Sequence, residues 1–217
     1  MKNVDVLYED EDCLVLNKPS GLATQGGAQV GASLDSLLRR EWDPAPLLVH
    51  RLDKDTSGII LVAKTKAAAG RYAALIAGRS VRKYYLALCA GSPASVSGVV
   101  SQPLTIRGVS KESLTKYAVL KSSQDNSLLE IELGTGRMHQ IRIHLARIGH
   151  PILGDDKYGD FALNRVWKKE LGIRRLMLHA HRLVIPRAVG EPLDIIAEPP
   201  ACFLPFLPAA LSDLADA

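Results

Sequence analysis

The chain has 217 residues, 47% of them hydrophobic, and a formal net charge of +4 at pH 7. This length predicts one large domain or two small ones, with apolar content sufficient for a sizeable core. No run of about 18 apolar residues is present, so we expect no membrane-spanning helix. Three scattered cysteines, Cys13, Cys89 and Cys202, have no metal-site or disulfide spacing and indicate a reducing, cytoplasmic setting.

The charges are unevenly distributed along the chain. Residues 1–60 hold six Lys and Arg against ten Asp and Glu, whereas residues 61–136 hold ten against four and residues 137–187 hold eleven against four. A polyanionic partner such as a nucleic acid fits this distribution. A solvated basic face is the alternative, because soluble proteins commonly have one.

Helices and strands are interspersed without a βαβ rhythm. The fold class that we expect is therefore α+β, a mixed, largely antiparallel sheet with flanking helices. The expected elements are, in chain order, strands at 4–9 and 13–17, a helix at 33–40, a strand at 59–63, a helix at 66–78, a strand at 82–90, a loop at 92–99, strands at 114–120 and 128–133, helices at 137–148 and 164–171, strands at 175–185 and 192–197, and a short helix near the end.

The most informative segment is residues 50–58, HRLDKDTSG. It places one carboxylate, Asp53, between basic residues in a loop-like cluster that leads into an apolar strand. Such a carboxylate can be a nucleophile, an acid or base, or half of an ion pair. Taken alone, it is more often a structural Asp that hydrogen-bonds its own turn.

This segment resembles the HRLD-x-x-TSG motif of the RluA-type RNA pseudouridine synthases at every fixed position. The resemblance implies the pseudouridine synthase fold, with Asp53 as the catalytic carboxylate that attacks the target uridine. The base is then detached, rotated and rejoined through carbon. Attack on the uracil ring and attack on the ribose both stay open. Arg51 adjoins the nucleophile and is expected to contact RNA, with a structural role as the alternative.

A second segment, residues 133–144, resembles the family motif TGR-x-HQ-[IL]-R-[IV]-H. By that resemblance Arg142 pairs with the catalytic Asp and helps to bind RNA, and a guanidinium suits this because it offers a bidentate fork. A surface arginine on an amphipathic helix is the alternative. Arg137, His139 and Gln140 are candidate RNA contacts, and for Arg137 and His139 the alternative is a plain helix-terminus residue.

A third segment, Lys83-Tyr84-Tyr85, resembles the family K-x-Y element. The spacing favours Tyr85 over Tyr84 as the ring that lies against the target base, since a flipped base needs a flat surface to replace its lost stacking. Lys83 is a further candidate RNA contact. A strand tyrosine is otherwise more often part of the core.

Two other segments match the family pattern. Residues 17–23 (NKPSGLA) resemble its N-K-P-x-G-L segment and are expected to be mainly structural, and residues 149–159 (GHPILGDDKYG) also match. The matches together span roughly residues 6 to 197. We therefore expect a single catalytic domain over residues 1–217, without the N-terminal RNA-binding domain of many family members.

The function expected from these motifs is isomerisation of specific uridines to pseudouridine in RNA, foremost ribosomal RNA of the large subunit. Transfer RNA is an alternative substrate. No cofactor and no metal are expected, and the protein is expected to be a cytoplasmic monomer. The competing functions are a non-catalytic RNA-binding or ribosome-assembly module on the same fold, and a nucleoside-cleaving glycosylase.

Overall fold

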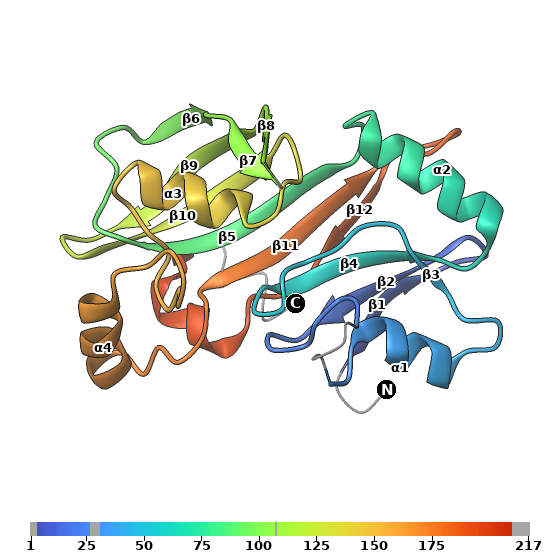
Figure 1. The fold of residues 1–217 in the computed structure, drawn as a ribbon, viewed down its shortest axis with the longest axis horizontal. Helices are drawn as coiled ribbons and strands as arrows, with labels where there is room; N and C mark the ends of the chain where they lie inside the picture. Colours follow the sequence, from blue (N-terminus) through green and yellow to red (C-terminus); the bar gives the residue numbers. More distant parts are fainter. Residues whose placement is uncertain (1–3, 27–30, 107, 210–217) are drawn as a thin grey trace. The chain divides into compact units, whose positions relative to one another are not determined.

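The structure is a computed structural model that describes residues 4–26, 31–106 and 108–209 (Figure 1). Internal contacts divide it into two compact units, each described here by itself. Unit 1 comprises Met1–Arg82 and Ala180–Ala197, and unit 2 comprises Lys83–His179 and Glu198–Ala217. Among the described residues, no helix is long and apolar enough to cross a membrane.

Unit 1 is built on adjacent strands in the order β1, β2, β4 and β11, with β3 on β4 and β12 on β11. Strand β2 is antiparallel to both β1 and β4, and β12 is antiparallel to β11. The bounds are β1 Asp5–Glu9, β2 Cys13–Lys18, β3 Leu47–Leu48, β4 Ser57–Ala63, β11 Leu178–Ile185 and β12 Leu193–Ile196. Every residue of β4 is buried, as expected of a strand that is apolar from Gly58 to Ala63.

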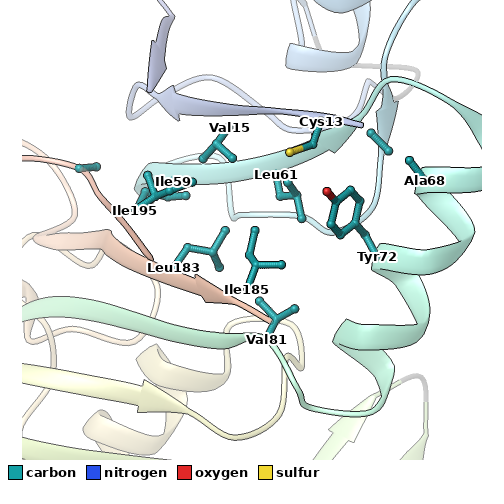
Figure 2. Close-up of a cluster of buried hydrophobic side chains, with 12 residues drawn as sticks. Cys13, Val15, Ile59, Leu61, Ala68, Tyr72, Val81, Leu183, Ile185 and Ile195 are labelled. Carbon is teal, nitrogen blue, oxygen red and sulfur yellow. The ribbon is translucent and has the colours of Figure 1, made fainter. Parts of the chain in front are cut away.

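Two helices accompany the strands of unit 1. Helix α1 (Leu34–Glu41) begins with a capping box in which Ser33 and Ser36 exchange hydrogen bonds. Helix α2 (Lys66–Ala77) begins at a Thr65 cap. Figure 2 shows the core of this unit, in which alternate residues of β2, β4 and β11 cluster with Tyr72 of α2.

Unit 2 contains an antiparallel sheet in the order β5, β10, β9, β6. A separate hairpin pairs β7 with β8, and α3 lies against β9 (Figure 1). The bounds are β5 Arg82–Ala90, β6 Ser97–Ser101, β7 Leu104–Ile106, β8 Val109–Lys111, β9 Leu114–Ser122, β10 Asn126–Leu133, α3 Gln140–Arg147, α4 Phe161–Glu170 and the 3₁₀ helix η1 Ala201–Phe206.

The fold class expected from the sequence is confirmed, and β5 has its expected bounds. Several local details differ from the prediction. Helix α4 begins three residues earlier than expected and β11 three residues later. The expected loop at 92–99 runs into β6, because Ser97 already pairs with β9. The β7–β8 hairpin was not foreseen, and α3 begins three residues later than expected because His139 has a φ of 54°. Residues 210–217 of the tail lie outside the described part.

Candidate active site

The loop that carries Asp53 is held from one side by the segment 18–24. The Thr24 hydroxyl donates to the carbonyl of Leu52 at 2.7 Å and accepts from the amide of the same residue at 3.1 Å. The Ser20 hydroxyl donates to the carbonyl of Asp55 at 2.7 Å. The backbone on both sides of Asp53 is thus tied to one segment, which gives the expected structural role of residues 17–23 a physical form.

Lys18 is the centre of this arrangement. Its side chain is 0% exposed. The ammonium donates to the carbonyls of Pro19 at 3.0 Å, Leu22 at 2.7 Å and Lys54 at 3.0 Å. A buried ammonium requires such acceptors, since an unpaired one is very costly. Lys18 therefore fixes the turn after β2 and, through Lys54, the residue next to Asp53.

The other side of the loop is anchored to β4. The amide of Leu61 donates to Nε2 of His50 at 2.9 Å, so this nitrogen carries no proton. Gly58 has a φ of 108°, and a Cβ there would lie 2.2 Å from the carbonyl oxygen of Ala180. Only glycine fits this position, which accounts for the Gly that closes the motif. Between these anchors Asp53 is half-buried and Arg51 is exposed.

The second group of site residues lies on α3 in unit 2. Arg142 is 4% exposed and makes a bidentate ion pair with Asp155, from Nε to Oδ2 and from Nη2 to Oδ1, both at 2.7 Å. Burial alone would raise the pKa of the Asp155 carboxyl. Hydrogen bonds from Arg142, Tyr158 and Lys157 outweigh that effect and hold this pKa below its usual value. The motifs did not identify Asp155 as a site residue, although it lies in the matching segment 149–159.

Around this pair, Tyr158 joins Arg142 to His139. The Arg142 guanidinium carbon lies 5.2 Å from the centroid of the Tyr158 ring, within cation–π range. The Tyr158 hydroxyl is 3.0 Å from Nδ1 of His139. His139 is half-buried and precedes α3 in a left-handed conformation that non-glycine residues seldom adopt. It remains a candidate RNA contact.

Gln140 has a structural role in addition to its predicted one. Its side chain is 2% exposed. Its oxygen accepts from the Thr135 hydroxyl at 2.6 Å and the Arg137 amide at 3.1 Å, and its nitrogen donates to the Leu114 carbonyl at 2.8 Å and the Thr115 hydroxyl at 3.0 Å. All four hydrogen-bonding positions of the amide are used inside the protein. The residue fastens the turn before α3 to β9, and RNA binding by Gln140 stays a prediction.

The remaining candidates of unit 2 lie on β5 and in that turn. Tyr85 is 6% exposed and is paired with Ile131 of β10, while its neighbour Tyr84 is half-buried. The ammonium of Lys83 lies 3.8 Å from where a Cβ on Gly136 would be, and burial lowers the pKa of this lysine. Arg137 is half-buried and Nε donates to the Glu112 carbonyl at 3.4 Å. Within the part of the chain that the structure describes, no cluster of three His, Cys, Asp or Glu could hold a metal ion.

Residues 12–147 match the family model described as RNA pseudouridylate synthase. The chain belongs to the RNA pseudouridylate synthase family, which confirms the family expected from the motifs. Enzymes of this family act on RNA.

Curated relatives include ribosomal large subunit pseudouridine synthase C of Vibrio parahaemolyticus, 39% identical over 81% of this chain and 59% of the relative. The protein of the same name from Pasteurella multocida is 40% identical over 88% of this chain and 63% of the relative. The chain thus spans about three-fifths of the length of the curated relatives it matches. Among solved structures, human RNA pseudouridylate synthase domain containing 4 matches with a TM-score of 0.78 at 30% identity, over 92% of this chain and 90% of that one.

Proposed function

We propose that this chain converts uridine to pseudouridine in RNA of the large ribosomal subunit, acting as one catalytic domain. Family membership and the names of the relatives support the reaction and the substrate. The single observation that carries the proposal is the loop at Asp53. It ties the backbone around one half-buried carboxylate to a buried lysine and to a threonine hydroxyl. Rigid support of this kind is what a reacting group needs.

In the proposed reaction Asp53 is the nucleophile. The bond from N1 of the uracil to the ribose breaks, the base rotates while it stays bound, and a bond from C5 to the ribose forms. The hydrogen on C5 leaves as a proton and N1 gains one, so the product is an isomer of the substrate. The reaction needs no oxidant or reductant, and Asp53 is regenerated at its end.

Other residues have supporting roles in this proposal. Tyr85 contacts the detached base, and Arg142 supplies positive charge beside the reacting groups. Arg51, Lys83, Arg137 and His139 contact the RNA. Arg51 has the most open position of these four, because its side chain is exposed. The protein acts as a monomer in the cytoplasm.

The test uses large-subunit RNA that carries tritium at C5 of its uridines. We expect the wild-type chain to release tritium to water and the Asp53→Asn variant to release none. Transfer RNA labelled in the same way is tested separately as the alternative substrate. Release from transfer RNA alone would mean that the reaction is correct but that the substrate is transfer RNA. Binding of RNA without release would mean a non-catalytic RNA-binding module, and free uracil in the mixture would mean a glycosylase.

A further inference from the structure

We propose that Asp155 is a positioning residue, which fixes the direction of the Arg142 guanidinium for the reaction. This inference rests on the proposed function, because it assigns Asp155 a task in the same chemistry. No motif argument pointed to Asp155. The assignment comes from its contacts, its burial and the way its own turn is held.

The ion pair between the two side chains is short and two-pronged. Both donor–acceptor distances are 2.7 Å, and the pair uses Nε and Nη2 of Arg142 with both oxygens of Asp155. Two parallel charge-assisted hydrogen bonds hold the guanidinium in the plane of the carboxylate. Any carboxylate or phosphate that Arg142 binds during catalysis must therefore approach the rest of the guanidinium, in a direction that Asp155 sets.

Asp155 is itself fixed in place. Its Oδ1 accepts from the amides of Lys157 and Tyr158, each at 2.9 Å. Asn164 of α4 donates from Nδ2 to the Asp155 carbonyl and accepts from the Gly154 amide, again at 2.9 Å. The residue is 0% exposed. A carboxylate held this firmly can hold its partner firmly, whereas a mobile one would let the guanidinium rotate.

Backbone and aromatic contacts complete the support. Gly154 has a φ of 72°, and a Cβ there would lie 2.0 Å from the Arg175 carbonyl oxygen, so the turn before Asp155 accepts only glycine. The Tyr158 ring contacts the guanidinium of Arg142 from the same turn. One short segment thus supplies both the carboxylate and an aromatic contact for Arg142.

The neighbouring Asp156 is a matched control. It also contacts Arg142, at 3.3 Å, but its side chain is 84% exposed. An exposed ion pair contributes little, because water competes for both partners. Two adjacent carboxylates therefore touch the same guanidinium, and only the buried one has the geometry to orient it.

The experiment compares Asp155→Asn, Asp156→Asn, Arg142→Ala and the double variant Arg142→Ala/Asp155→Asn. Single-turnover rates are measured with saturating large-subunit RNA, below the melting temperature of every variant. We expect Asp155→Asn to lower the rate about 100-fold, as misplacement of a reacting group by about 1 Å does, with the Kd for RNA changed less than about threefold. Asp156→Asn should match the wild type. The double variant should be no slower than Arg142→Ala, because Asp155 acts through Arg142.

The proposal would be overturned if the rate losses of Arg142→Ala and Asp155→Asn multiplied in the double variant. A wild-type rate for Asp155→Asn would overturn it as well. If Asp155→Asn does not fold, Asp155→Glu replaces it. That variant keeps the charge but shifts the carboxylate by one methylene, and it should lose rate while its melting temperature stays near that of the wild type. A wild-type rate in folded Asp155→Glu would equally overturn the proposal.

A second readout is independent of activity. In nitrogen-15 NMR spectra the Nε–H of Arg142 should exchange slowly with water in the wild type and in Asp156→Asn, and rapidly in Asp155→Asn. Slow exchange in Asp155→Asn would overturn the positioning role, whatever the rates are. If the wild type forms no pseudouridine at all, the proposed function fails, and the NMR result then decides separately whether Asp155 orients Arg142.

Discussion

The Asp53 loop and the Arg142 helix are both organised by one fully buried charge, but the charges have opposite signs. In unit 1 the Lys18 ammonium donates to three backbone carbonyls. In unit 2 the Asp155 carboxylate accepts from two backbone amides and from the Arg142 side chain. A buried cation is stabilised by carbonyl acceptors and a buried anion by amide donors. Each of these charges therefore supplies hydrogen bonds to an irregular loop whose backbone lacks those of a helix or a sheet.

The difference between the two lies in what they hold. One of the three carbonyls bound by Lys18 belongs to Lys54, the residue next to Asp53, and the other two belong to Pro19 and Leu22 in the segment that holds the loop. Loss of Lys18 should therefore loosen the loop. Asp155 joins a loop to a functional side chain, so its loss should misdirect Arg142 even where the fold survives.

Removal of the Arg142 guanidinium, which is paired with Asp155 in unit 2, should have the largest effect on the reaction rate. Arg142→Ala should lower the rate of pseudouridine formation by about 10²–10³-fold, the usual loss when one preorganised electrostatic contact is removed. Arg142→Lys should recover little, because lysine has no fork for Asp155. Single-turnover kinetics measure both. A wild-type rate for Arg142→Lys would show that charge alone matters.

Removal of the charge in unit 1 should act mainly through stability. Lys18→Met keeps an unbranched side chain, one atom shorter, but removes the ammonium and leaves buried carbonyls unsatisfied, at about 1–3 kcal/mol each. We expect a lower midpoint in urea unfolding and a rate reduced by about tenfold as the Asp53 loop loosens. Lys54→Met at an exposed position of the same loop is the control and should change neither. Equal stability of Lys18→Met and the wild type would contradict the anchoring role.

The acid dependence of stability should separate Asp155 from surface carboxylates. The pKa of Asp155 is held below its unfolded value, so its contribution is complete above about pH 4 and is lost as the pH falls through the folded pKa. In unfolding experiments between about pH 2 and pH 6, Asp155→Asn should therefore lose less stability on acidification than the wild type does. An unchanged pH dependence in Asp155→Asn would contradict the assigned pKa shift.

The smallest effect is expected from substitution of Arg51, whose side chain is exposed. Arg51→Ala should weaken RNA binding by less than about tenfold and flatten its dependence on salt by about one unit of slope, since one phosphate contact is lost. Titrations at several salt concentrations measure this slope. If affinity, slope and turnover are all unchanged, Arg51 has no contact with RNA. A loss of turnover much larger than the loss of affinity would place its action at the extrusion of the uridine.

The sequence predicted the regular elements better than the contacts that support the Asp53 loop and Arg142. Strand β5 and the Ser33 cap follow local patterns of apolar and capping residues, which a single sequence displays. The role of Lys18 depends on the carbonyl of Lys54, which is 36 positions away. Asp155, the buried carboxylate that Arg142 binds, is 13 positions away. No periodicity encodes such pairs.

Two residues show the same limit. Gln140 lies in a motif that the resemblance links to RNA, and its amide makes four hydrogen bonds within the protein that the sequence does not display. Asp155 lies in the matching segment 149–159, and nothing in that segment shows that its carboxylate is buried against Arg142. The burial of such a side chain depends on which strands and helices pack around the turn.

The most direct test of the central claim maps pseudouridines in RNA from cells that lack this protein. We predict that specific pseudouridines of the large-subunit RNA are absent, that the wild-type gene restores them, and that a gene encoding Asp53→Asn does not. A large-subunit RNA with every pseudouridine still present in the deletion strain, or restored fully by Asp53→Asn, would contradict the account.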